Sequence, residues 1–122
     1  MKYKLDNLSE LPLLLNFILA KAFLDRGLES KLRSPLSVFS ESLSIREKKT
    51  EIILQKIEDA FIEIHNNQFI KYKFEVVLSP KDIMIEISII NNNMVKIESI
   101  KKMLQENAHS LDRIGYEATL NF

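Results

Sequence analysis

Apolar and polar residues alternate with a period of two in the second half of the chain. Every second residue is apolar over 70–78, and the alternation resumes over 83–90. A Ser-Pro-Lys-Asp turn separates the two runs, which is typical of an antiparallel hairpin whose first set of residues faces the core. On the outward face we expect Val77 and Met84 beside the turn and Ile90 at the strand end.

A period of 3.6 residues predicts a helix between residues 45 and 67. Ser44 and Glu47 have the Ser-x-x-Glu spacing of a capping box, which would start this helix at Ser44. The His-Asn-Asn run at 65–67 would end it. The predicted buried positions lie three or four residues apart: Ile53, Ile57, Ala60, Phe61 and Ile64.

Residues 11–24 form the most apolar stretch of the chain. We expect a helix with Ser9 as its N-cap, ending near Arg26, with Gly27 in the left-handed region after it. A bilayer-spanning helix needs about 20 apolar residues, so a membrane span is not predicted, and neither is a cleaved export signal. A helix this apolar must be covered on most sides, either by the rest of the chain or by a second subunit.

The remaining segments complete a predicted β-β-α-β half. A third helix is expected over 94–111, with Ile97 and Ile100 among its core residues and Met94 and Met103 off that face. Short strands are expected over 2–6 and 116–122. The serine-rich segment 28–44 should be a packed connector with at most one short helix.

Together these elements predict one domain over 1–122 of the α+β class. Its helical half is 1–66 and its β-β-α-β half is 67–122. The N-terminal helices pack on one face of a small antiparallel sheet, and the second half has the split βαβ, half-ferredoxin-like arrangement. We expect the strand at 116–122 beside the first hairpin strand, and the helices over 45–67 and 94–111 on the covered face.

The composition of the chain argues against several classes of ligand and reaction. Seventeen Lys and Arg balance seventeen Asp and Glu among 122 residues, which argues against direct binding of nucleic acid or of an anionic membrane. The absence of cysteine excludes disulfides and thiolate ligands. His65 and His109 have no metal-ligand spacing, so the sequence predicts no metal, cofactor or catalytic residue.

The apolar surplus on the outward sheet face favours a non-enzymatic protein-binding module that acts sterically on a partner. Val77, Met84 and Ile90 are its expected interface residues. The alternative is a homodimeric intracellular assembly or secretion chaperone, paired through helix 10–26 or a sheet edge. A small hydrolase or nuclease is the third class.

The first half of the chain also resembles a family. The segments KLDN (4–7), LNFIL (15–19) and GLESKLR (27–33), followed by a charged helix, resemble small uncharacterised proteins of tailed phages and prophages of low-GC Gram-positive bacteria. The resemblance covers residues 2–60 and implies a mobile-element origin and a non-enzymatic role. With it, the expected function is that of an inhibitor of a host defence or host enzyme, or a phage-assembly accessory, in the cytoplasm of the bacterial host.

Overall fold

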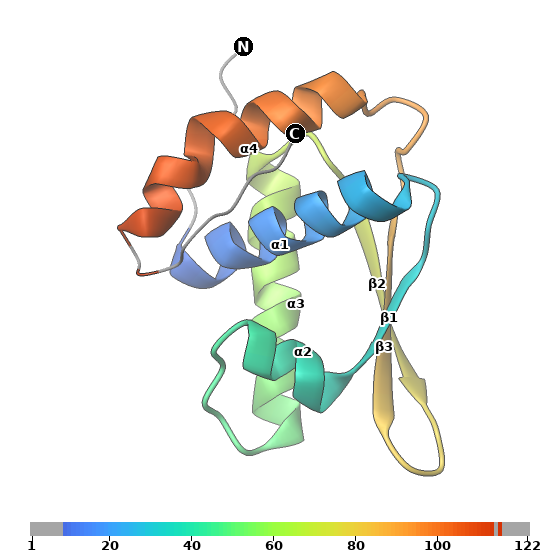
Figure 1. Cartoon of the computed structure of the whole chain (residues 1–122). Helices are drawn as coiled ribbons and strands as arrows, with labels where there is room; N and C mark the ends of the chain where they lie inside the picture. Colours follow the sequence, from blue (N-terminus) through green and yellow to red (C-terminus); the bar gives the residue numbers. More distant parts are fainter. Residues whose placement is uncertain (1–8, 114, 116–122) are drawn as a thin grey trace.

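The computed structural model describes residues 9–113 and 115, and these form helices on one side of a three-stranded antiparallel sheet (Figure 1). The elements in chain order are α1 (Glu10–Arg26), β1 (Leu32–Pro35), α2 (Leu36–Ser42), α3 (Thr50–Asn67), β2 (Tyr72–Leu78), β3 (Ile83–Ile89) and α4 (Ile97–Asp112). The α+β class predicted from the sequence is confirmed.

The predicted hairpin is confirmed as β2 and β3. Its turn closes with a hydrogen bond from the Ser79 amide to the Asp82 carbonyl at 3.0 Å. The strands pair antiparallel, with Val77 opposite Met84. The four-residue turn fixes this register, so the two runs of alternating residues present the same face of the sheet together.

The third strand of the sheet, β1, comes from the connector. It pairs antiparallel with β3, with Leu32 opposite Ile87, which gives the order β1-β3-β2. The prediction of a packed segment with a short helix is confirmed by α2, but β1 was not predicted. The strands expected over 2–6 and 116–122, and the strand order that depends on the latter, lie outside the described residues.

The predicted capping box is wrong. Ser44 has a positive φ of 57° and its amide bonds to the Glu41 carbonyl, so it belongs to the turn that ends α2. An N-cap residue needs extended backbone, which Ser44 does not have. The chain runs on without helix to Lys49, α3 starts at Thr50, and Glu47 forms an ion pair with Lys56 at 3.4 Å. The five predicted core residues of this helix are all buried.

Helix α1 is covered by the chain itself. It packs against both α3 and α4, and Leu15, Phe17 and Ala20 have no exposed surface. The predicted bounds are confirmed: Ser9 is the N-cap, although its hydroxyl donates to Glu63 Oε1 at 3.0 Å, not to the helix. Gly27 follows with φ 106° and ψ 142°, a positive φ as expected but outside the left-handed helical region.

Helix α4 was predicted to cover the sheet, but it packs mainly on α1. The side of α4 that faces α1 is buried. That side includes Met103, which was predicted to lie off the core face and accepts a hydrogen bond from Asn16 of α1. Ile97 in the first turn was predicted to be buried and is half exposed. Ile100 is buried as predicted.

None of the helices within the described ranges combines the length and apolar character needed to cross a membrane.

Candidate functional site

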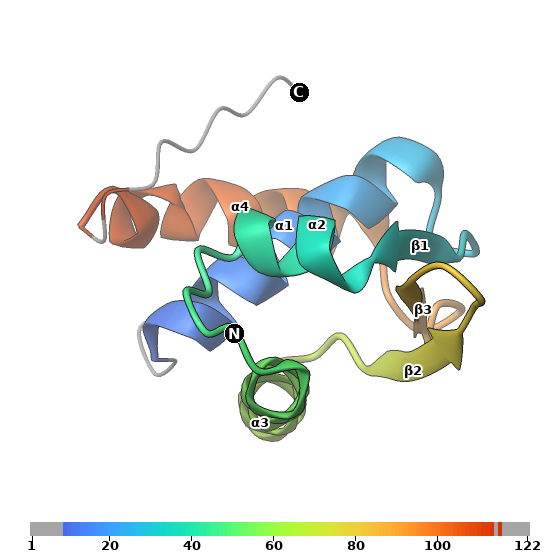
Figure 2. The same ribbon diagram turned by 90° about the horizontal axis from the view of Figure 1, so that it is seen from below.

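The sheet has one covered and one open face. Helices α2 and α3 contact it from one side, where Tyr72, Ile85, Ile87 and Ile89 are buried. Seen from below, all four helices lie on that side, and no described element crosses the opposite face (Figure 2). We take this opposite surface, called the open face below, as the candidate site.

An apolar row crosses the open face near the hairpin turn. Met84 on β3 lies opposite Val77 on β2 and opposite Pro35 on β1, so the three side chains follow one another across the sheet. All three are partly exposed. Directly opposed side chains on one face of an antiparallel sheet are about 5 Å apart, so the row is a continuous apolar strip.

A charged row lies next to the apolar row. Glu86 on β3 is opposite both Arg33 and Glu75, and its side chain is only 9% exposed. Arg33 Nε donates to Glu86 Oε1 at 2.8 Å, and Lys31 Nζ lies 3.9 Å from Glu86 Oε2. Two carboxylates face each other here, and each has a cation beside it, since Lys73 Nζ lies 2.8 Å from Glu75 Oε1.

The Lys73–Glu75 pair shifts the titration of both groups. The hydrogen bond from Lys73, with help from the charges of Lys73 and Lys31, lowers the pKa of Glu75, and the same hydrogen bond raises the pKa of Lys73. Both side chains stay ionised near neutral pH. The open face therefore offers a partner an apolar strip bordered by alternating charges, and not a uniformly basic surface.

The structure brings two of the three predicted interface residues together. Val77 and Met84 are cross-strand neighbours. Ile90 is 62% exposed but follows the end of β3, six residues from Met84, or about 20 Å at 3.3 Å per residue. Pro35, which completes the apolar row, was missed because β1 was not predicted.

Two hairpin residues predicted to face the core are exposed. Phe74 stacks on Phe61 of α3 at 5.1 Å between ring centroids. Beyond it, Val76 is 42% and Leu78 is 80% exposed. The side chains of Val76 and Leu78 point to the helix side of the sheet. They are exposed because β2 extends beyond the last residue that the core covers.

One hollow of the surface lies on the helix side, away from the apolar row. This hollow, of about 550 Å³, lies between the start of α1 and α3 and has Lys56, Asp59 and Glu63 in its wall. Neither histidine lines it. His65 Nε2 instead accepts a hydrogen bond from the Tyr72 amide at 3.1 Å. Among residues 9–113 and 115, no three Asp, Glu or His side chains gather closely enough to hold a metal ion.

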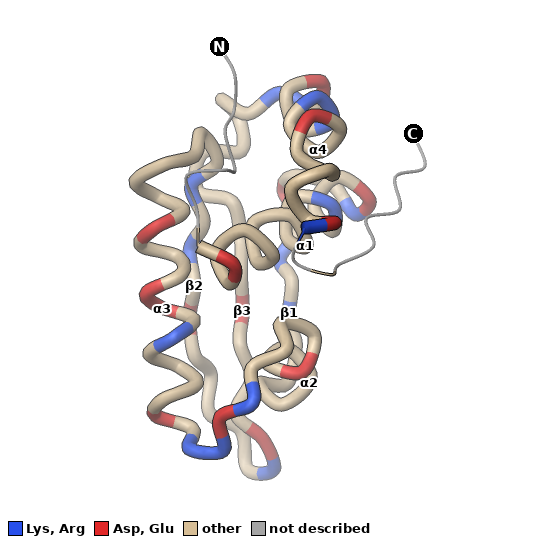
Figure 3. The backbone as a smooth tube through the Cα atoms, turned by 90° about the vertical axis from the view of Figure 1, so that its left-hand side faces the viewer, with Lys and Arg blue, Asp and Glu red and all other residues tan. Residues whose placement is uncertain are grey.

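Charges of both signs are interspersed over the helices as well. On α3, one lysine, Lys56, lies among four acidic residues, which are Glu51, Glu58, Asp59 and Glu63 (Figure 3). Comparison of the chain with protein families, with characterised proteins and with solved structures finds no match.

Proposed function

We propose that this protein is a non-enzymatic protein-binding module that acts by occupying a partner's surface with its open sheet face. The observation that carries the proposal is the apolar row of Pro35, Met84 and Val77 on a face that no described element covers. An exposed apolar surface bordered by paired charged side chains is typical of a surface that recognises another protein.

The residue types in the row suit this role. Methionine adapts its shape to a partner because its side chain is unbranched and polarisable. A few apolar anchors near the centre of an interface carry most of the binding free energy, while the polar rim sets orientation. Met84 lies at the centre of the row, and the Arg33–Glu86 pair borders it.

In its more specific form the proposal is a phage-encoded inhibitor of a host defence or host enzyme, or a phage-assembly accessory, in the bacterial cytoplasm. The resemblance of residues 2–60 to phage and prophage proteins supports this form. A steric mechanism needs only that the bound face blocks a functional surface of the partner.

The homodimeric chaperone was predicted to pair through a sheet edge or through the apolar surface of the first helix. That surface is covered within the chain by α3 and α4. Helix α1 therefore does not require a second subunit, and no feature of residues 9–113 and 115 favours the chaperone over the binding module.

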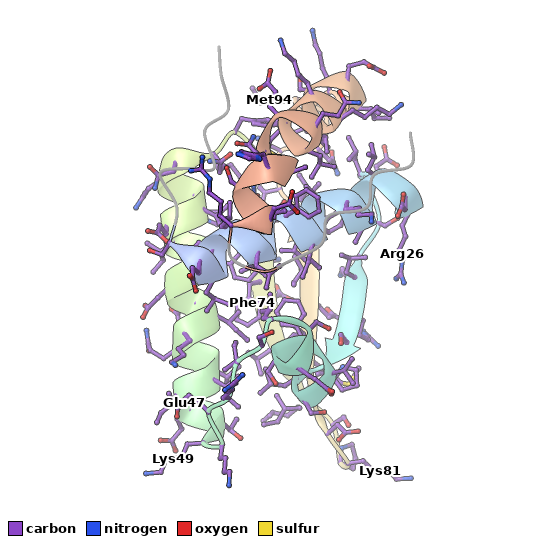
Figure 4. All side chains as sticks on the ribbon, turned by 60° about the vertical axis from the view of Figure 1, so that its left-hand side comes forward. Arg26, Glu47, Lys49, Phe74, Lys81 and Met94 are labelled. Atoms are coloured by element: carbon purple, nitrogen blue, oxygen red, sulfur yellow. The ribbon has the colours of Figure 1, made fainter. Side chains whose placement is uncertain are left out.

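The experiment is site-specific photo-crosslinking in the native host. A photoreactive amino acid replaces Met84 in one variant and Met94 in another. Met94 is 79% exposed at the opposite end of the molecule from the hairpin turn, where Lys81 lies (Figure 4). The proposal predicts one protein crosslinked through position 84 and not through position 94. Equal crosslinking at both positions, or none at position 84, would contradict it.

A further inference from the structure

The outer edge of β2 carries backbone groups without a described partner. In an antiparallel pair, alternate residues point their N–H and C=O groups toward the neighbouring strand. The Ile90 amide donates to the Lys71 carbonyl, so the odd-numbered residues of β2 face β3. Tyr72, Phe74, Val76 and Leu78 therefore direct their backbone groups to the outer edge.

One of these groups is already occupied. The Tyr72 amide donates to His65 Nε2 at 3.1 Å, so α3 closes the edge at that end of the strand. No described residue bonds to the outward backbone groups of Phe74, Val76 or Leu78. Three consecutive outward positions thus present up to three donors and three acceptors.

The other edge of the sheet differs. β1 has only four residues, and Leu32 and Ser34 face β3, which leaves Arg33 and Pro35 directed outward. Proline has no N–H, and short strands with proline are a common way to block unwanted pairing. β2 has seven residues and no proline.

The side chains at the β2 edge fit a backbone partner that also carries apolar groups. Val76 and Leu78 are exposed on the helix side, next to the position that an added strand would take. On the open face the same strand carries Lys73 and Glu75 and then Val77. An added strand would thus meet apolar side chains on one face and one charge of each sign on the other.

We propose that β2 is the docking edge for an extended segment of the partner protein, which adds antiparallel as a fourth strand at Phe74, Val76 and Leu78. This inference rests on the proposed protein-binding function and specifies how the partner attaches. The segment carries apolar residues opposite these three positions, a basic residue opposite Glu75 and an acidic residue opposite Lys73.

The size of the open face supports an attachment at the edge. Three strands about 4.8 Å apart and seven residues of about 3.3 Å give roughly 300–400 Å². A stable complex buries about 800 Å² on each partner, so the open face alone is too small. The β2 edge is continuous with the apolar row through Val77.

A second copy of the chain does not fit this edge. Helix α3 packs over β2 and runs alongside it at the outer side of the sheet (Figure 3). Two paired β2 strands would be about 4.8 Å apart, which would bring two α3 helices closer than the 8–10 Å that packed helices need. A single extended segment has no such helix.

The test uses a synthetic peptide and the full chain. The probe is the capped heptapeptide Val-Thr-Val-Lys-Val-Glu-Val, whose lysine falls opposite Glu75 and whose glutamate falls opposite Lys73. Titration by heteronuclear NMR should shift the amide signals of Phe74, Val76 and Leu78 most. N-methylation of the valine at peptide position 3, which faces Val76, should weaken binding about tenfold or more, because it blocks the paired backbone groups.

Two matched peptides complete the design. N-methylation of the lysine should leave the affinity within about twofold, because that amide points away from β2. Exchanging lysine and glutamate, which places like charges opposite Glu75 and Lys73, should weaken binding by about threefold or more. Equal affinities of the two N-methylated peptides would overturn the proposal, and so would the absence of shifts at millimolar peptide.

Hydrogen exchange of the full chain without peptide gives an independent check. The amides of Phe74, Val76 and Leu78 should exchange much faster than those of Lys73 and Glu75, which face β3. Protection of the three edge amides, by the strand expected over 116–122 or by a second copy, would overturn the inference. Crosslinking through position 84 does not depend on the β2 edge. A crosslink at that position together with failed peptide binding would therefore refute docking at the β2 edge and leave the proposed binding function standing.

Discussion

A buried polar contact between α1 and β2 gives a sharp stability prediction. Tyr72 is 1% exposed, and its hydroxyl donates to Asn16 Oδ1 at 3.3 Å. Asn16 has no exposed surface, and its Nδ2 donates to the Met103 sulfur at 3.7 Å. Burial raises the pKa of the Tyr72 phenol, so the hydroxyl remains a donor across the whole working pH range.

The two partners should be strongly non-additive. Tyr72→Phe leaves the Asn16 carbonyl oxygen buried without this donor, and Asn16→Leu leaves the phenol without this acceptor. Each single change should reduce the free energy of unfolding by about 1–3 kcal/mol. The double variant replaces both groups by apolar groups of similar shape, and it should lie within about 1 kcal/mol of the wild type.

Urea unfolding followed by circular dichroism measures the four free energies of the cycle. The expected result is a double variant more stable than either single variant. A double variant whose loss equals the sum of the two single losses would show that the hydroxyl and the amide do not depend on each other, and the reasoning would fail.

Three further predictions test individual features. Desolvation, with the charge of Lys71, lowers the pKa of His65 below its ordinary 6.5. The stabilisation that neutral His65 provides is therefore complete above about pH 6.5 and is lost as the pH falls through the folded-state pKa. Between about pH 7.5 and 5, the free energy of unfolding measured with urea should therefore fall more steeply for the wild type than for His65→Gln. Equal dependence of this free energy on pH in the two proteins would contradict the prediction. Gly27→Ala should lower the free energy of unfolding by about 1–3 kcal/mol, because an alanine is strained at a φ of 106°. A decrease below about 0.5 kcal/mol in urea unfolding would refute this reasoning. In the same assay, Met103→Ala should lower the free energy of unfolding by about 2–5 kcal/mol, because Met103 is buried, while Met94→Ala should change it by no more than about 0.5 kcal/mol, because Met94 is exposed. Similar decreases for the two variants would contradict the burial of Met103 and the exposure of Met94.

Local patterns predicted those elements whose structure is set by nearby residues. The hairpin follows from a period of two on both sides of a four-residue turn, and the register at Val77 and Met84 follows from the turn length. Helix α1 was predicted from its apolar run, its N-cap position and Gly27, all of which lie within the segment itself.

The elements that were missed depend on residues far away in the sequence. β1 is a strand because the open edge of β3, about fifty residues later, pairs with it; four residues that include a proline carry no strand signal of their own. The capping box failed because Ser44 is required for the turn that ends α2. A local motif cannot show which of two neighbouring helices will use a residue.

The same limit applies to the candidate site. Its central pair, Val77 and Met84, was predicted as outward and adjacent to the turn. Pro35 and the Arg33–Glu86 pair could not be predicted, because they depend on the β1–β3 register. Val76 and Leu78 were assigned to the core because alternation shows which face a side chain points to, but not how far the covering helices extend.

The most direct test of the open face as a binding surface is the affinity for the partner identified by crosslinking. Isothermal titration would compare the wild type with Met84→Glu and with the matched Met94→Glu, after circular dichroism shows that both variants are folded. Met84→Glu places a charge at the centre of the apolar row and should raise the Kd by about 30-fold or more, while Met94→Glu should leave it unchanged. Equal Kd values for the two folded variants would contradict the account.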